Sequence, residues 1–333
     1  MDKETQQLFK IVDRFARQKI AVWGDLILDE HLYGRTRRIS REAPVLILIY
    51  QNRELSLGGA GNSLQNLRAL GAHPIPVGVI GDDAEGQIII NILKALKIPT
   101  KYLFKEKDYL RPLKTRILAG EENTRKQQIL RIDRERKVPE SAALKEKMRK
   151  ALANAIQDCA GLIISDYNYL TVKEDIYRKI APAARKRKIP VALDSRFRLL
   201  HFQGATVSTP NEPEVEHALK IELGDNNELL REAGKKILKT NESPGLLITR
   251  GSKGMALFEI GKPPYFIPIH GPTDIVDVTG AGDTVISVFT LALASGATFR
   301  QAAHLANYAG GVVVMKKGAA TLTPLELKQA IIS

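Results

Sequence analysis

The chain has 333 residues, of which 44% are hydrophobic and 26% charged, and its formal net charge is +13. These values are typical of a globular protein and exclude disorder over most of the length. No run of about 18 apolar residues that could span a membrane is present, and the single cysteine, Cys159, excludes an internal disulfide and a cysteine-rich metal site. We therefore expect a cytoplasmic protein.

The positive charge raises the question of a nucleic-acid partner. Basic residues cluster at 185–188 and at 35–38, but aromatic residues make up only 6% of the chain and are not interleaved with these clusters as base stacking requires. The six histidines show no i, i+4 pair of the kind that binds zinc. We interpret most of the charge as solvated surface, with a minority that steers anionic substrates, and expect neither a nucleic-acid nor a membrane partner.

Residues 19–24 form a short apolar run that ends in glycine, which predicts a buried parallel strand. Asp25 and Asp29 follow this strand. Ligands of open α/β sheets bind at the carboxyl ends of the strands, so both carboxylates are candidates for hydrogen bonds to sugar hydroxyls. Turn formation or helix capping is the alternative for each.

Three extended segments lie outside the alternation of strands and helices. They are residues 38–50, 113–119 and 128–133, with a turn at 120–123 between the last two. We expect them to form a small separate sheet over about residues 31–50 and 111–134. Such a sheet at the ligand-binding edge would act as a lid.

A glycine-rich segment at 57–63 opens a helix that ends near Gly71. Gly58 and Gly59 permit close approach of the backbone to a ligand, and Asn62 offers a donor and an acceptor to a polyhydroxylated molecule. A plain loop followed by a helix cap is the alternative.

From residue 160 onward short apolar strands alternate with helical spacers, which predicts a mostly parallel, doubly wound sheet. The strands are expected at 161–166, 190–194, 205–208 and 245–249, followed by an antiparallel pair at 255–259 and 265–269 and a closing helix at 302–316.

Two of these strands are followed by loops suited to a nucleotide. The first, residues 249–254, offers flexible backbone, hydroxyls and cations for the outer phosphates. The second, residues 210–214, carries the carboxamide of Asn211 and the carboxylate of Glu214, which could hold Mg²⁺ through water. Either segment could also be an ordinary loop.

The segment 277–284, Asp-Val-Thr-Gly-Ala-Gly-Asp-Thr, opens a run whose apolar residues continue for about four turns. Gly280, Ala281 and Gly282 are therefore expected at the N-terminus of a buried helix, where unpaired N–H groups and the helix dipole attract an anion. Asp283 next to this anion site suits a general base that takes a proton from an attacking hydroxyl. A carboxylate that only favours the helix dipole is the alternative.

Two common nucleotide motifs are absent. No segment matches the G-x-x-x-x-G-K-[ST] loop, and the Gly-Ala-Gly segments at 59–61 and 280–282 lack the third glycine of a dinucleotide fingerprint. The loops after the strands, taken together with Asp283, favour phosphoryl transfer.

These segments resemble the ribokinase-like, or pfkB, carbohydrate kinases over essentially the whole chain. Residues 58–62 are similar to the N-terminal signature of that family and residues 277–284 to its C-terminal signature. The resemblance implies one α/β domain over residues 1–333, with a ribokinase-like doubly wound, mostly parallel sheet flanked by helices and a small β-sheet lid. It also implies ATP and Mg²⁺ as cofactors.

Within the family the similarity is to kinases that phosphorylate D-glycero-β-D-manno-heptose 7-phosphate at O1, on the route to ADP-heptose for lipopolysaccharide. Residues 38–45, 128–133 and 209–214 carry this similarity. The chain departs from those kinases at two places. Asn168-Tyr169-Leu170 stands where they carry Ala-Lys-Gly, and Ser195-Arg196-Phe197 stands where they carry Pro-Lys-Gly, so the acceptor is less well defined than the chemistry.

The resemblance implies a role for each site residue. Gly280, Ala281 and Gly282 hold the charge of the moving phosphoryl group and Asp283 accepts the proton, while a monovalent cation could lie near Asp277. The expected sugar ligands are Asp25, Asp29, Gly58, Gly59 and Asn62, and the candidates for a phosphate already on the sugar are Lys114, Arg116, Arg131 and Arg196. The expected nucleotide ligands are Asn211, Glu212, Pro213, Glu214, Thr249, Arg250, Gly251, Gly254 and Asn307, with Asn211 and Glu214 also at the metal.

Related kinases often pair their lid strands across a dimer, so we expect a homodimer. Some are fused to a nucleotidyltransferase domain, and we expect none in this chain, which ends at Ser333. Three alternatives stay open: a kinase of the same family for another sugar, sugar phosphate or nucleoside; a non-catalytic sugar-binding regulator; and a basic nucleic-acid binder.

Overall fold

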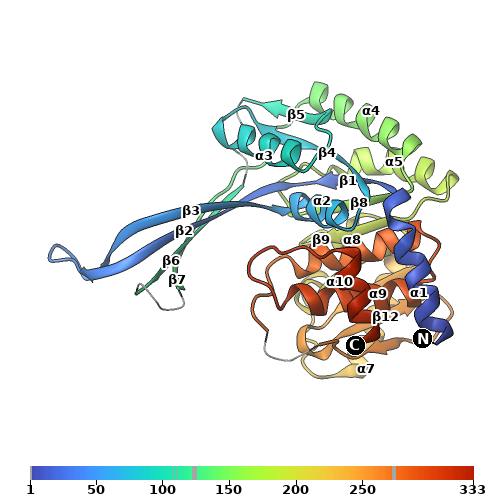
Figure 1. The fold of residues 1–333 in the computed structure, drawn as a ribbon. Helices are drawn as coiled ribbons and strands as arrows, with labels where there is room; N and C mark the ends of the chain where they lie inside the picture. Colours follow the sequence, from blue (N-terminus) through green and yellow to red (C-terminus); the bar gives the residue numbers. More distant parts are fainter. Residues whose placement is uncertain (1, 108, 111, 122–125, 272–274) are drawn as a thin grey trace.

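The computed structural model describes residues 2–107, 109–110, 112–121, 126–271 and 275–333. Within these residues nine strands form the main sheet (Figure 1). Six neighbouring pairs of strands are parallel, and the two pairs that involve β12 are antiparallel. In spatial order the strands are β13 (Tyr265–Ile267), β12 (Met255–Glu259), β11 (Gly245–Thr249), β10 (Val207–Ser208), β9 (Val191–Ser195), β8 (Gly161–Asp166), β1 (Lys19–Gly24), β4 (His73–Gly81) and β5 (Tyr102–Glu106).

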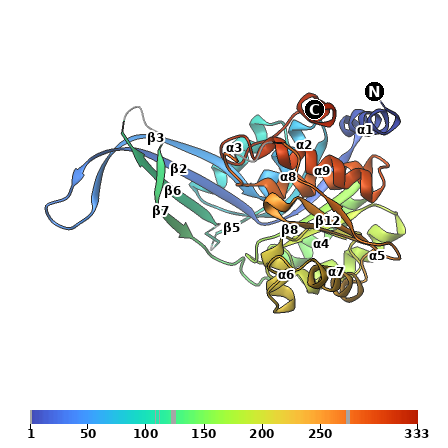
Figure 2. The same cartoon turned by 90° about the horizontal axis from the view of Figure 1, so that it is seen from below.

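Helices cover both faces of this sheet, as Figure 2 shows from below. One face packs against α1 (Lys3–Asp13), α2 (Ala60–Ala69), α3 (Ala84–Ala95), α8 (Ala281–Ala294), α9 (Phe299–Val313) and α10 (Pro324–Ile332). The other packs against α4 (Ala142–Asp158), α5 (Glu174–Lys186), α6 (Glu212–Leu219) and α7 (Asn227–Asn241). Short 3₁₀ helices lie at Phe15–Arg17, Leu199–His201 and Gly251–Lys253.

Strand β1 illustrates why the central strands are apolar throughout. Ile20 and Val22 enter the core beneath α2, whereas Ala21 and Trp23 enter the core on the opposite face. Successive side chains of a strand point to opposite faces, so a strand covered by helices on both sides buries every residue. The sequence-based prediction of a doubly wound, mostly parallel sheet is confirmed.

A second sheet of four strands projects from the main body (Figure 1). Its order is β3 (Leu46–Gly59), β2 (Leu26–Ile39), β6 (Leu113–Gly120) and β7 (Gln127–Arg134). The small separate sheet is thus confirmed. The prediction of one extended segment at 38–50 is wrong, because that stretch contains the ends of two long antiparallel strands and the loop between them. The predicted turn at 120–123 falls partly outside the described residues.

Strand β2 begins one residue after β1 ends, so the chain passes from the main sheet into the lid with only Asp25 between them. No Pro or Gly cluster marks this transition, which is why the first half of β2 was not predicted. Helices α1 and α10 and strand β5 were also not predicted, and α10 rather than α9 closes the chain. The helices α1 and α10 lie side by side, and Lys328 Nζ reaches Asp13 Oδ1 at 2.5 Å (Figure 1).

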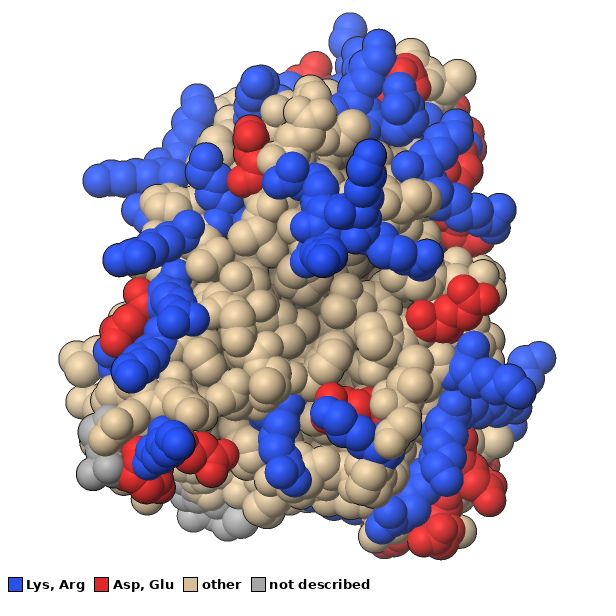
Figure 3. Space-filling model, turned by 90° about the vertical axis from the view of Figure 1, so that its right-hand side faces the viewer, with Lys and Arg blue, Asp and Glu red and all other residues tan. Residues whose placement is uncertain are grey.

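Lys and Arg side chains are spread in separate groups over the face drawn in Figure 3, with a broad uncharged area between them. The basic run at 185–188, at the end of α5, is fully exposed. Among the described helices, none has the length and apolar character needed to cross a membrane.

Candidate active site

The N-terminus of α8 forms an open cradle of backbone N–H groups. Gly280 caps the helix with φ +76°, a conformation that favours glycine, and a Cβ there would overlap Asn62 Nδ2. At Gly282, by contrast, an added Cβ would meet no atom within 4 Å. The Ala281 N–H donates to the Val278 carbonyl at 3.2 Å, so the prediction that Ala281 offers a free donor is corrected. The space beside the Gly280 and Gly282 N–H groups is open, and the helix dipole makes it attractive to an anion.

Asp283 lies in the first turn of α8 and is only 4% exposed. Asn62 Nδ2, from α2, donates to Asp283 Oδ2 at 2.9 Å, and the Tyr167 hydroxyl, from the loop after β8, donates to Oδ1 at 3.1 Å. Burial raises the pKa of Asp283 to about 7, against the opposing effect of these two hydrogen bonds. A carboxylate with that pKa can take up a proton at neutral pH.

The amide of Asn62 is itself oriented by its neighbours. Asn62 Nδ2 also reaches the Gly280 carbonyl at 3.2 Å, and Asn66 Nδ2 donates to Asn62 Oδ1 at 3.2 Å. These contacts leave the Nδ2 group facing Asp283. Asn62 therefore belongs to the same site as Asp283, as the sequence suggested.

Asp29 lies within β2, and its Oδ1 accepts a hydrogen bond from Arg116 Nη1 at 2.5 Å. A Cβ at Gly58 would overlap Asp29 Oδ2, so glycine is required for this carboxylate to fit. At Gly59 the backbone has φ +57°, and a Cβ would come 3.2 Å from the Tyr167 ring. The glycines thus allow the start of α2 to approach the end of β1 and the loop after β8.

Two cations flank the ring of Tyr167. Lys114 Nζ and the Arg196 guanidinium carbon each lie 5.9 Å from the ring centroid. Burial, and secondly the charge of Arg196, lowers the pKa of Lys114. Within the described residues neither cation hydrogen bonds to a carboxylate, whereas Arg131 is bound to Asp133 through two hydrogen bonds of 2.8 and 2.7 Å.

Two cavities are lined by neighbours of Asp283. One, of about 160 Å³, is lined by Ala281 and Gly282 together with four residues of the predicted nucleotide site, namely Thr249, Gly251, Gly254 and Asn307. The other, of about 340 Å³, is lined by Tyr167 and Arg196 and by basic residues of the segment 135–137. Asp283 thus adjoins a residue of the first cavity and is hydrogen bonded to a residue of the second.

A family model described as "pfkB family carbohydrate kinase" matches residues 17–326. The chain belongs to the pfkB family of carbohydrate kinases. It is therefore a phosphotransferase that acts on a sugar hydroxyl, and kinases of this ribokinase-like group use ATP.

Curated relatives of this pfkB kinase include proteins named "Bifunctional protein HldE". The protein of that name from Geobacter metallireducens is 39% identical over 307 residues, which cover 92% of this chain and 61% of the relative. The one from Haemophilus influenzae is 37% identical over 318 residues and is covered to 64%. The chain thus spans a little under two thirds of the length of these relatives.

Solved structures support the fold. Arabidopsis thaliana ribokinase complexed with ribose and ATP has a TM-score of 0.71 at 19% identity, covering 94% of this chain and 98% of that one. Escherichia coli phosphofructokinase-2 in complex with potassium has a TM-score of 0.73 at 17% identity, covering 95% and 98%. The ribokinase-like fold of the pfkB kinase is therefore shown.

Asp25 does not face the cleft of the kinase. It is completely buried, and its carboxylate accepts hydrogen bonds from the backbone N–H groups of Tyr167, Tyr169 and Thr171 at 2.9, 3.1 and 3.1 Å. The prediction that Asp25 contacts the sugar is thus wrong, because its oxygens are occupied by the loop after β8. Asp25 holds that loop instead.

The predicted nucleotide loops also contain structural residues. Arg250 Nε donates to Glu212 Oε1 at 2.8 Å and Nη2 to Asn227 Oδ1 at 3.0 Å, and the Arg250 side chain is only 8% exposed. The prediction that Arg250 and Glu212 are nucleotide ligands is corrected, because the two side chains bind each other and join the loop after β11 to the start of α6. Pro213 occupies the first turn of α6, as proline often does.

Asn211 and Glu214, the predicted metal residues, form a reciprocal capping box. Asn211 Oδ1 accepts from the Glu214 N–H at 2.8 Å, and Glu214 Oε2 accepts from the Asn211 N–H at 3.0 Å. Burial, and secondly the charge of Glu214, raises the pKa of Asp194 well above its usual range, and burial raises the pKa of Glu214. Carboxylate oxygens are the donors that Mg²⁺ prefers, so these two side chains are the candidates to hold it.

No group of three or more potential metal ligands occurs within the described ranges. The donor set therefore fits Mg²⁺ that is held through water and phosphate oxygens rather than by an all-protein cage. Asp194 and Tyr167 were both missed as site residues. Asp194 could have been found as the carboxylate that ends a predicted strand, but nothing in the sequence distinguished Tyr167 from a core aromatic.

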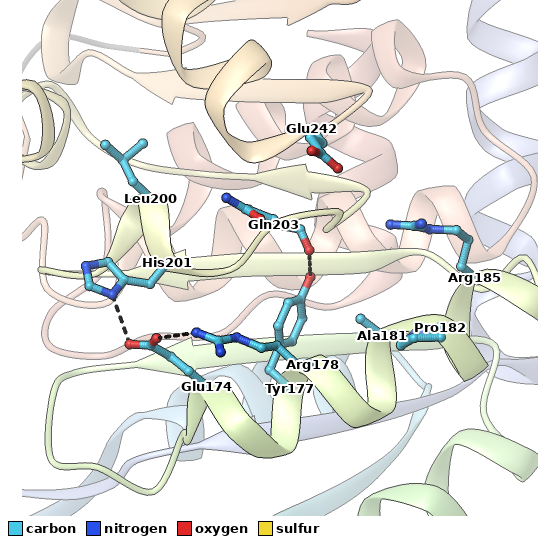
Figure 4. A pocket seen from close by; sticks show the side chains of 10 residues that line it. All are labelled: Glu174, Tyr177, Arg178, Ala181, Pro182, Arg185, Leu200, His201, Gln203 and Glu242. Atoms are coloured by element: carbon cyan, nitrogen blue, oxygen red, sulfur yellow. Dashed lines mark hydrogen bonds and ion pairs between the residues drawn. The ribbon is translucent and has the colours of Figure 1, made fainter.

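A further cavity of about 510 Å³ lies beside α5 and contains none of the predicted site residues (Figure 4). There Glu174 accepts from Arg178 at 3.4 Å and lies 2.9 Å from His201 Nδ1. This cavity is connected to the candidate active site only indirectly. Arg198 lies 4.0 Å from Glu174 and hydrogen bonds to Asp166, which ends β8 and precedes Tyr167.

Gly282→Ala should separate stability from catalysis. An alanine in the first turn of α8 finds open space, so we expect the free energy of unfolding in urea to rise by about 0.5 to 1 kcal/mol. The same methyl group enters the anion cradle, and a displacement of about 1 Å there should lower kcat roughly 10²-fold. Turnover equal to that of the wild type would show that the phosphoryl group does not lie at this helix end.

Proposed function

We propose that this kinase transfers the γ-phosphoryl group of ATP to O1 of a sugar that already carries a phosphate, D-glycero-β-D-manno-heptose 7-phosphate or a close analogue. The observation that carries the proposal is the contact of Asp283 with Asn62 and Tyr167 beside the open N–H groups of α8. A proton acceptor and an anion cradle in one helical turn suit an attacking hydroxyl and a transferring phosphoryl group.

The phosphate on the acceptor is supported by Lys114 and Arg196. Lys114 is 92% buried, and neither cation hydrogen bonds to a carboxylate within the described part of the chain. The charge of Arg196 lowers the pKa of Lys114, and an anionic ligand would relieve this repulsion. The heptose is supported by the similarity of residues 38–45, 128–133 and 209–214 to heptose kinases.

In the proposed reaction the acceptor hydroxyl donates its hydrogen bond to Asp283 and attacks the γ-phosphorus in line. The new bond joins the acceptor oxygen to phosphorus, the bond to the β–γ bridging oxygen breaks, Asp283 takes the proton and ADP leaves. The N–H groups of Gly280 and Gly282 stabilise the charge on the phosphoryl oxygens. Asp29 and Asn62 orient the sugar, and the lid excludes water.

Mg²⁺, when bound, neutralises charge on the outer phosphates of ATP. Asp194 and Glu214 would hold it through water. A monovalent cation near Asp277 stays a prediction, and there the carboxylate already accepts from the N–H groups of Thr279 and Gly318, each at 2.9 Å.

A homodimer through the lid is supported by the apolar surface of that sheet. Every residue of β7 is exposed, and β3 and β7 are the edge strands. Exposed sheet edges that carry large apolar side chains favour association with another chain. The exposed apolar residues of the lid are Ile39, Val45, Leu46, Ile49, Tyr50, Ile129, Leu130 and Ile132.

Asp283→Asn should leave ATP binding nearly intact, because the carboxylate is proposed to act on the acceptor hydroxyl. We expect kcat to fall by at least the ~10² that loss of a general base brings. The measurements are ADP release in a coupled assay and ATP affinity by calorimetry, with the exposed Asp13→Asn as a control that keeps full turnover. Near-normal turnover of Asp283→Asn would remove Asp283 from this role.

A panel of acceptors tests the substrate. We expect heptose 7-phosphate to give a higher kcat/KM than fructose 6-phosphate, and both to exceed ribose and fructose, because Lys114 and Arg196 favour a phosphate. Arg196→Gln should remove most of the preference for the phosphorylated sugars and leave the ATP affinity unchanged. Equal rates with phosphorylated and free sugars would contradict a phosphate-bearing acceptor.

The oligomeric state tests the lid interface. We expect light scattering to give twice the chain mass of 36.8 kDa for the wild type. Leu130→Glu with Ile132→Glu places two charges on one face of β7 and should yield a monomer, whereas Leu325→Glu, at a more exposed site on α10, should not. A wild-type monomer, or a dimer that both variants retain, would contradict dimerisation through the lid.

A further inference from the structure

We propose that Tyr167 is a positioning residue for Asp283: its hydroxyl fixes one carboxylate oxygen of the base and keeps the carboxylate in its ionised form. This inference rests on the proposed role of Asp283 as proton acceptor. Neither the family match nor the relatives give Tyr167 such a role, and it stands on contacts around the loop after β8.

Two donors hold the Asp283 carboxylate from different elements. Asn62 Nδ2 occupies Oδ2 from α2, and the Tyr167 hydroxyl occupies Oδ1 from the loop after β8. An ionised carboxylate offers about four acceptor positions, so each oxygen keeps one for the acceptor hydroxyl. The pair of donors therefore fixes the carboxylate without blocking it.

The Tyr167 hydroxyl is a donor at every physiological pH. Burial, and secondly the charge of Asp283, raises the pKa of Tyr167 well above its usual value. A protonated phenol that donates to Asp283 favours the ionised carboxylate over the neutral acid. Because Asp283 is buried and has a pKa of about 7, loss of this hydrogen bond would leave more of the base protonated at neutral pH.

The backbone of Tyr167 is held from inside the protein by Asp25. The buried Asp25 carboxylate accepts from the N–H groups of Tyr167, Tyr169 and Thr171, which wraps the loop around a single side chain. Hydrogen bonds from backbone N–H groups to a carboxylate are stronger than those between neutral groups. The position of the Tyr167 ring therefore depends on Asp25, which explains a carboxylate with no access to the cleft.

The same loop is strained. Asn168 and Leu170 both have φ +68°, a left-handed conformation that is unusual for leucine. Such strain persists where the surroundings over-determine the backbone, and it occurs often at functional sites. Here Asp25 is one anchor, and Asp166 is the other, since it accepts from the Asn168 N–H at 3.1 Å and is bound by Arg198 and Ser195.

The ring of Tyr167 is also fixed from the sides. Lys114, from β6, and Arg196, from the loop after β9, each lie 5.9 Å from its centroid, a distance at which a cation is attracted to a ring. Backbone, ring and hydroxyl of Tyr167 are thus all held. A residue that served only to fill the core would need none of these three sets of contacts.

Other charged groups also face Asp283. Asp29 from β2 raises its pKa, Lys114 from β6 lowers it, and Asp194 from β9 interacts with it electrostatically. Tyr167→Phe keeps the ring and leaves all three groups in place. A change in the titration of Asp283 in this variant therefore reports the lost hydroxyl.

Tyr169→Phe is a matched control. Tyr169 lies in the same strained loop, and its hydroxyl donates to Glu135 at 2.5 Å and not to Asp283. Asp25, whose pKa is raised to about 6 chiefly by burial, anchors the loop equally in both variants. Any effect of loop loosening at low pH is therefore common to the two.

The experiment is the pH profile of kcat/KM between pH 5.5 and 9, at saturating MgATP, with heptose 7-phosphate or the panel member of highest turnover as acceptor. Since the base must be ionised, activity should fall on the acid side with a midpoint near 7. We expect Tyr167→Phe to move that midpoint upward by about one pH unit, as loss of a hydrogen bond to a charged group should, and Tyr169→Phe to leave it unchanged.

A Tyr167→Phe profile with the wild-type midpoint, whether or not its plateau is lower, would overturn the inference and leave Tyr167 a structural residue. An equal shift in Tyr169→Phe would also overturn it, since the loop rather than the hydroxyl would then be responsible. A wild-type profile with no fall in activity on the acid side would instead contradict Asp283 as the base. This outcome concerns the proposed function alone, because it is seen in the wild type without any variant.

Discussion

The contact between Asn62 and Asp283 joins two helices whose residues are 221 positions apart in the chain. It belongs to a polar seam between α2 and α8 inside an otherwise apolar core. Thr284 Oγ1 donates to Asn66 Oδ1 at 3.0 Å, and Ser287 Oγ reaches the Ser63 carbonyl at 3.4 Å. Burying a polar group destabilises the folded protein unless the group is hydrogen bonded. These hydrogen bonds therefore fix the register of α2 against α8. The proposed base, Asp283, and its hydrogen-bond partner Asn62 are thereby set in place by packing.

The helix that carries the proposed base, α8, also carries the proposed anion cradle. Nearly all of α8 is buried, which removes Asp283 from water and raises its pKa, while the glycines at the helix mouth leave the N–H groups accessible. Burial alone would leave the carboxylate protonated over much of the neutral range. The donors on its two oxygens, one from α2 and one from the loop anchored by Asp25, oppose that tendency. The chemistry of the site thus depends on a balance between desolvation and hydrogen bonding.

Local patterns in the sequence were sufficient for most strands of the main sheet, though not for β5, and for α8 and the placement of Asp283 and Asn62 in one site. They failed where a contact between residues far apart in the chain determines the position of an element or the orientation of a side chain. The polar helix α1 acquires its place by packing beside α10, and β2 leaves the main sheet for the lid without a turn residue. Asp25 was wrongly predicted as a sugar ligand because the local sequence does not show whether a carboxylate after a strand faces a ligand or a neighbouring loop. Arg250 was misread for the same reason, since its partner Glu212 lies 38 residues away.

The most direct test of the account is a structure of the kinase with a non-hydrolysable ATP analogue, Mg²⁺ and heptose 7-phosphate. The account predicts that a sugar hydroxyl lies about 2.6 to 3.2 Å from an Asp283 oxygen, with the γ-phosphate at the N–H groups of Gly280 and Gly282. A sugar hydroxyl out of reach of Asp283, or a γ-phosphate away from the mouth of α8, would contradict it.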